Sequence, residues 1–172
     1  MTTPSNSQSS PLGDAFADLD SELASTRKVL ERFPSEKGDW RPHAKSRTIG
    51  QLAVHVAQLP GLGISILTQE FLDAFARPAA PELGTAADLV AHFDQNVQAF
   101  LDALANSNAD DLNKTWSLRA GDRVFVNGPR RMLLRPMIIN HLIHHRAQLG
   151  VYYRLLDVPV PVIYGPTADE SF

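Results

Sequence analysis

Apolar residues recur at helical spacing in four long segments of this 172-residue chain. Such spacing gives each helix one face to bury against its neighbours. The segments cover about residues 14–33, 48–75, 85–105 and 129–156, and Thr48 and Thr85 are suitable N-caps for the second and third. Four amphipathic helices with short connections predict an all-α fold, a four-helix bundle.

Two prolines and one polar turn modify this pattern. Pro60 lies inside the second segment, where a missing amide hydrogen and a steric clash predict a kink, with the helix resuming towards Phe75. Residues 115–126 contain short strand-favouring runs around a Gly-Asp turn, which predicts a small β-hairpin before the last helix. Pro136 predicts a bend within that last helix.

The ends and the composition of the chain restrict its location and partners. Residues 1–11 are polar and lack the features of a signal peptide, so we expect a disordered tail before a single domain at 12–172. No uninterrupted apolar run approaches the ~18 residues of a membrane span. A net charge of −3 indicates neither a nucleic-acid nor a membrane partner. The absence of cysteine excludes disulfides and thiolate ligands and fits a cytoplasmic protein.

Two histidines, His141 and His145, lie one helical turn apart in the apolar last segment. Residues spaced in this way stack on one helix face, so two imidazoles can bind a single metal ion. On a helical projection they share a side with Ile138 and Leu149, which predicts that they face the core. His55 lies in the middle of the apolar stripe of the second segment and is the natural third ligand. Three neutral imidazoles that leave coordination positions open are a known catalytic metal arrangement.

The remaining candidates are less specific. A histidine on an apolar face is often a core residue bonded to a carbonyl, so a purely structural role stays open. His144 lies near the edge of the stripe, and Gln148 is close enough on the helix to reach the site or to bond a neighbouring helix. His43, in a loop, and His92, on an expected solvent face, receive no role. Histidine suits zinc, nickel, copper or iron, so the residue types do not select the ion.

Positive charge is concentrated near the C-terminal part of the chain. Between residues 114 and 154 there are eight Lys and Arg residues and one acidic residue. This stretch is either a solvated basic face or a patch that receives an anionic substrate or thiol cofactor. In the second case Arg130, Arg131 and Arg135 would help to admit the anion.

Three separate stretches, at residues 49–61, 140–149 and 160–170, resemble the DinB-like family, also called YfiT-like. The likeness extends from about residue 12 to the end of the chain. It implies a four-helix bundle with a three-histidine metal site on His55, His141 and His145. It also implies zinc or nickel as the usual ion and frequent homodimers. Some relatives transfer low-molecular-weight thiols such as bacillithiol or mycothiol to electrophiles.

Two positions depart from the branch of the family that this chain resembles. Gln58 stands where that branch often has an acid, and Leu62 stands where it often has tryptophan.

Three hypotheses for the function follow from the sequence. The first is a metal-dependent enzyme, a thiol transferase or hydrolase that acts on a small molecule, with its catalytic residues unknown. The second is a non-catalytic metal-binding protein of a stress response, with a closed site. The third is a structural dimerisation bundle.

Overall fold

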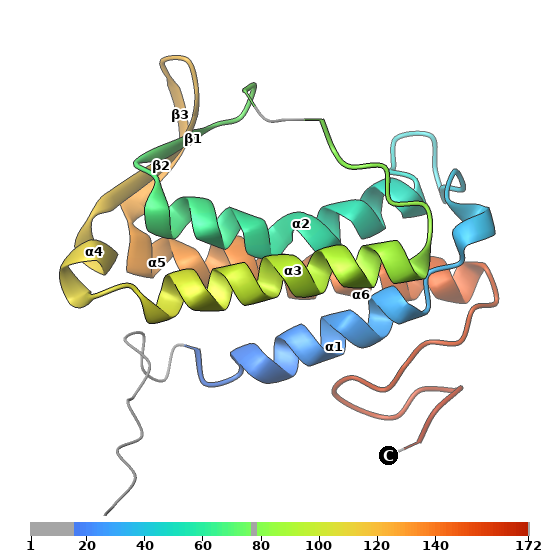
Figure 1. Cartoon of the computed structure of the whole chain (residues 1–172). Helices are drawn as coiled ribbons and strands as arrows, with labels where there is room; N and C mark the ends of the chain where they lie inside the picture. The colour runs from blue at the N-terminus through green and yellow to red at the C-terminus, as the bar shows by residue number, and fades with distance from the viewer. Residues whose placement is uncertain (1–15, 77–78, 172) are drawn as a thin grey trace, which may run out of the picture.

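The computed structural model describes residues 16–76 and 79–171. Its four long helices are α1 (Leu19–Glu31), α2 (Ile49–Thr68), α3 (Ala86–Ala105) and α6 (Asn140–Leu155). Each of α1 and α2 packs against both α3 and α6, so the four form a closed bundle (Figure 1). Shorter helical elements are η2 (Ser35–Lys37), α4 (Ala109–Asn113), α5 (Arg130–Leu134) and η3 (Arg135–Ile139). The predicted bundle is confirmed.

The core lies where the four long helices meet. Its fully buried side chains include Leu30 of α1, Val56 and Ile66 of α2, Phe93 of α3 and Leu142 of α6. By length and composition alone α2 could cross a membrane, but more than half of its apolar stretch is buried within the bundle. Such burial is typical of a core helix of a bundle.

Local capping determines where α2 and α3 begin. Thr48 Oγ1 accepts a hydrogen bond from the Gln51 backbone amide at 3.1 Å, and Gln51 Oε1 accepts one from the Thr48 amide at 3.0 Å. Thr85 and Asp88 form the same reciprocal capping box at the start of α3. Because such boxes satisfy amides that the first turn leaves without partners, they fix the helix start to the residue. Both predicted N-caps are confirmed.

A three-stranded sheet projects from one end of the bundle (Figure 1). Strands β2 (Thr115–Ala120) and β3 (Arg123–Pro129) form the predicted antiparallel hairpin, and Gly121 adopts a positive φ of 55° in its turn. Strand β1 (Phe71–Asp73) pairs with β2 in parallel. The expected continuation of the second helix to Phe75 is therefore wrong, because pairing with a distant strand replaces helix after Thr68.

The other helix boundaries differ slightly from expectation. α2 runs through Pro60 without ending, since buried neighbours such as Leu59 hold the helix in place. Pro136 lies in η3, a π-helical segment between α5 and α6, where a local change in helix geometry was expected. The first helix begins at Leu19 rather than near residue 14. The predicted tail at residues 1–11 lies outside the described residues.

Candidate metal centre

Three imidazoles meet between α2 and α6. His55 Nε2 lies 3.3 Å from His141 Nε2, which lies 2.9 Å from His145 Nε2. The ligand nitrogens of all three rings lie within 4.8 Å of one another, and each ring is partly buried. No aspartate or glutamate belongs to this cluster within the described part of the chain. The structure therefore brings together the three predicted histidines.

The rotation of α6 differs from the helical projection. Its buried residues are Leu142, Arg146, Leu149 and Tyr153, and this stripe rather than the histidines is centred on the core. His141 and His145 lie beside the stripe, half-buried at its edge. The prediction that His141 and His145 face the core therefore holds only in part, because Arg146 rather than a histidine lies in the buried stripe.

Hydrogen bonds orient the ring of His145. Its Nδ1 lies 2.7 Å from Gln148 Oε1, an oxygen that can only accept, so Nδ1 carries the proton. In the neutral ring this leaves the Nε2 lone pair directed towards His141. Gln148 in turn donates through Nε2 to His144 Nε2 at 3.2 Å. Of the two roles predicted for Gln148, the structure therefore supports contact with the histidine site. The exposed His144 is a hydrogen-bond partner of Gln148.

The surroundings of His141 and His145 lower the pKa of both rings. Burial is the largest cause that lowers the pKa of His141, and the neighbouring His145 lowers it further, while a hydrogen bond to the Met137 backbone opposes the shift. Burial also lowers the pKa of His145, against the opposing hydrogen bond to Gln148, and the charge of Arg47 contributes to lowering both pKa values. A depressed pKa favours the neutral imidazole, which is the form that binds metal ions.

The nitrogen spacing fits a single metal ion. Zinc–nitrogen bonds are about 2.0–2.1 Å long, so two ligands at a tetrahedral angle lie about 3.3 Å apart. The separations of 3.3 and 2.9 Å are close to this value, and the third pair of nitrogens lies within 4.8 Å. Protons could bridge these nitrogens only in pairs, whereas one ion would satisfy three lone pairs together. The residues present therefore fit a divalent transition metal.

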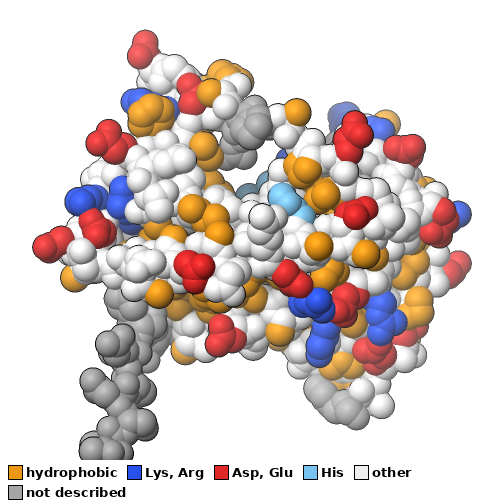
Figure 2. All heavy atoms as spheres, viewed as in Figure 1, with side chains coloured by type: hydrophobic (Ala, Val, Ile, Leu, Met, Phe, Trp, Pro, Cys, Tyr) orange, Lys and Arg blue, Asp and Glu red, His pale blue; other side chains and the backbone are white. Residues whose placement is uncertain are grey.

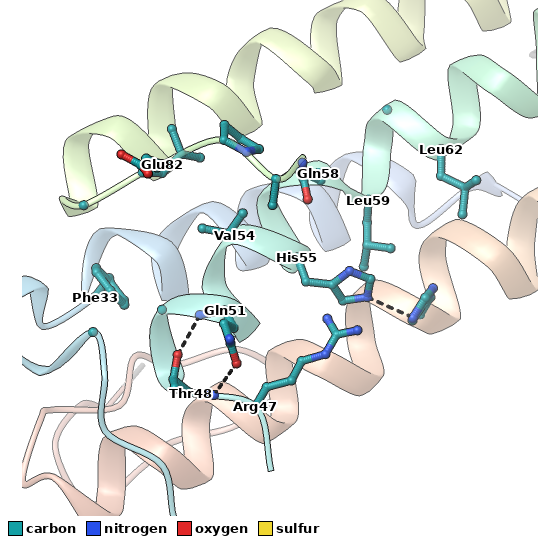
Figure 3. A pocket seen from close by; sticks show the side chains of 18 of the residues that line it. Phe33, Arg47, Thr48, Gln51, Val54, His55, Gln58, Leu59, Leu62 and Glu82 are labelled. Atoms are coloured by element: carbon teal, nitrogen blue, oxygen red, sulfur yellow. Dashed lines mark hydrogen bonds between the residues drawn. The ribbon is translucent and has the colours of Figure 1, made fainter. Parts of the chain in front are cut away.

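A cavity of about 1420 Å³ opens beside the histidines and is lined by both His55 and His141. Figure 2 shows histidine at the floor of a hollow in the surface. Gln58 and Leu62, the two positions that depart from the related branch, also line this cavity from α2 (Figure 3). The volume exceeds that of a typical small-molecule site, so a substrate or cofactor has room beside the cluster.

The basic residues predicted to admit an anion have other roles. Arg130 is buried and donates to the backbone oxygens of Leu67 and Gln69, at 2.7 and 2.9 Å. Arg135 pairs with Asp18. Neither of them, nor the exposed Arg131, lines the cavity beside the histidines. The hypothesis that Arg130, Arg131 and Arg135 admit an anionic substrate or cofactor is therefore not supported.

The other two histidines stay outside the site. His43 is exposed in the loop before α2, where its Nδ1 accepts from the Lys45 amide at 3.1 Å. His92 is half-buried on α3, not fully solvent-facing as expected. Neither belongs to the cluster.

Sequence reasoning missed two cavity residues, Arg41 and Arg47. Both come from the loop between α1 and α2. Figure 3 shows Arg47 extending from this loop towards His55. The sequence does place Arg47 directly before the N-cap Thr48, and therefore at the N-terminal end of α2. It does not indicate the direction of the Arg47 side chain.

The fold and the cluster place this protein among helical bundles with a candidate metal centre. The chain belongs to the DinB family, whose model matches residues 8–171. It is 29% identical over 151 residues to the protein YrdA of Bacillus subtilis (strain 168), covering 87% of this chain and 85% of that protein. The resemblance predicted from the sequence is confirmed.

Solved structures support the fold. A DinB-like protein of Bacillus subtilis, YjoA, superposes with a TM-score of 0.66 at 16% identity, covering 88% of this chain and 97% of that one. A DinB-like protein of Bacillus cereus ATCC 10987 gives a TM-score of 0.64 at 22% identity, covering 87% and 95%. At these identities the likeness concerns the fold alone.

Proposed function

We propose that this protein is a metal-dependent enzyme that activates a thiol or water for reaction with a small electrophile. The observation that carries the proposal is the convergence of three imidazole nitrogens beside a large cavity, whose wall includes His55 and His141. A sealed cluster would suit storage or structural binding, whereas a cluster open to a cavity leaves space for a reactant.

The residues of the chain have separate roles in this proposal. His55, His141 and His145 would hold a divalent ion, with zinc or nickel the best candidates. A bound ion would supply Lewis acidity, which lowers the pKa of a thiol or water and increases the supply of nucleophile near neutral pH. Gln148 fixes the His145 ring so that Nε2 faces the site. The cavity positions the electrophile, and no general acid or base is assigned.

Turnover that depends on the metal tests this proposal. Purified protein would be stripped with a chelator, reloaded with zinc or nickel, and assayed with several low-molecular-weight thiols, a chromogenic electrophile and activated esters. We expect transfer or hydrolysis only in the loaded protein, because the ion generates the nucleophile. A chelator added during turnover should stop the reaction, and fresh ion should restore it.

The alternative is a non-catalytic metal-binding protein. It uses the same three histidines, so metal content alone does not distinguish the two. Stoichiometric metal without turnover of any thiol or ester would support this alternative and contradict the enzyme proposal. Turnover that is equal in stripped and loaded protein would contradict both.

A further inference from the structure

Arg47 lines the same cavity as His55 and His141, two of the three clustered histidines. In Figure 3 its guanidinium group extends towards the ring of His55. Within the described residues no ion pair joins Arg47 to a carboxylate, although several other arginines have such partners. The backbone oxygen of Arg47 accepts a hydrogen bond from the Tyr152 hydroxyl at 3.5 Å. Its side chain is thus an available cation beside the site.

The backbone around Arg47 is held firmly. The next residue, Thr48, is the N-cap of α2 and belongs to its capping box. The Gly50 amide donates to the Gly38 oxygen at 3.0 Å, so the segment between these two residues, which contains Arg47, is closed by a backbone hydrogen bond. Trp40 of this loop stacks edge-on against Tyr152 of α6, with ring centroids 5.6 Å apart. Because its main chain is fixed in advance, Arg47 loses less freedom when it binds a ligand.

With a divalent ion at the histidines, the positive charges around the cavity would exceed the negative ones. Its wall contains Arg41 and Arg47, against two exposed acids, Asp39 and Glu82. The three imidazoles are neutral ligands and contribute no negative charge to offset a divalent ion. No ion pair joins either acid to an arginine among the described residues. A ligand that fills this cavity would therefore meet an excess of positive charge.

We propose that the ligand of this cavity carries an oxyanion, such as a carboxylate, that binds Arg47 while its sulfur or oxygen atom lies at the histidine cluster. This inference rests on the proposed metal site. Guanidinium presents a planar pair of N–H donors that matches an oxyanion. Arg47 is then a specificity-determining residue, which selects anionic over neutral reactants of the same length.

Matched thiols test this assignment on the full-length protein loaded with cobalt(II), a visible-light probe of the site. One series consists of mercaptoacetate, 3-mercaptopropionate and 4-mercaptobutyrate; the other consists of neutral mercapto-alcohols of equal chain length. Binding is followed by the cobalt absorption and by calorimetry. We expect at least one anionic thiol to bind about ten-fold more tightly than its neutral partner, since hydrogen bonds to charged groups contribute that much.

Substitution of Arg47 provides the decisive comparison. Arg47→Gln should remove the advantage of the anionic thiol and leave the Kd of the neutral thiol and the cobalt stoichiometry unchanged. Arg131→Gln is the matched control, because Arg131 is exposed and outside the cavity. Arg47→Lys should keep part of the advantage, since it retains the charge but not the paired donors.

The outcomes separate this inference from the proposed function. If cobalt binds but Arg47→Gln weakens both thiol series equally, or neither, the role of Arg47 is wrong while the metal site stands. If the wild-type protein takes up no stoichiometric cobalt, the metal site is wrong and the assignment of Arg47 fails with it.

Discussion

His141→Ala should abolish stoichiometric binding of a divalent transition metal. His141 is the central ring of the cluster, since its Nε2 lies within 3.3 Å of the corresponding atoms of both His55 and His145. Its loss leaves two imidazoles and removes the pair that chelates across one helical turn. We expect the metal content of the purified protein, measured by inductively coupled plasma mass spectrometry, to fall from about one ion per chain to background.

His92→Ala is the matched control for this experiment. His92 is a half-buried histidine on α3 outside the cluster, so its removal should leave the metal content unchanged. Circular dichroism of both variants separates loss of metal from loss of fold. Equal metal in the two variants would mean that the ion binds elsewhere, and the three-histidine site would have to be abandoned.

Glu22→Ala should lower the free energy of unfolding by about 3–5 kcal/mol, because it leaves a buried guanidinium without its counter-charge. Glu22 Oε2 accepts from Arg146 Nη2 at 2.7 Å, and the side chains are only 6% and 2% exposed. Tyr164 of the C-terminal tail donates to the same carboxylate at 2.8 Å. Urea unfolding of the two proteins measures the difference.

An exposed ion pair gives the comparison for Glu22. Glu31 pairs with Arg27 one turn away on α1, and both side chains are nearly half exposed. Glu31→Ala should therefore cost no more than about 1 kcal/mol. If the two substitutions destabilise the protein equally, the buried pair of Glu22 and Arg146 contributes no more to stability than an exposed ion pair. Replacement of both Glu22 and Arg146 by leucine should recover most of the loss, since no unpaired charge then remains.

The buried network also bears on the metal centre. Arg146 directly follows His145, and its bonds to Glu22 tie one side of α6 to α1. With that side fixed, His141 and His145 are held towards α2 and the cavity. Stability and site geometry are therefore linked through the rotation of one helix.

Periodicity was sufficient to predict the bundle and the meeting of the three histidines. Helical spacing is a local property, and the pairing of His141 with His145 follows directly from one turn of helix. His55 could be added because it interrupts an otherwise apolar stripe. These inferences needed no knowledge of how the helices are arranged in space.

Features that depend on distant partners could not be read in the same way. β1 forms because β2 offers a strand edge, so local apolar spacing wrongly extended the second helix to Phe75. The burial of Arg146 could not be predicted from local spacing, since a buried charge is costly unless a partner such as Glu22 is known to face it. The direction of Arg47 depends likewise on a loop fixed by contacts from α6.

X-ray absorption spectroscopy of the zinc-loaded protein tests the central claim most directly, because it reports the ligands of the ion itself. We predict three imidazole nitrogens at about 2.0–2.1 Å, with the remaining position filled by a water oxygen. The His141→Ala protein should lose this signal. A zinc spectrum with one imidazole or none in the wild-type protein would contradict the shared site on His55, His141 and His145.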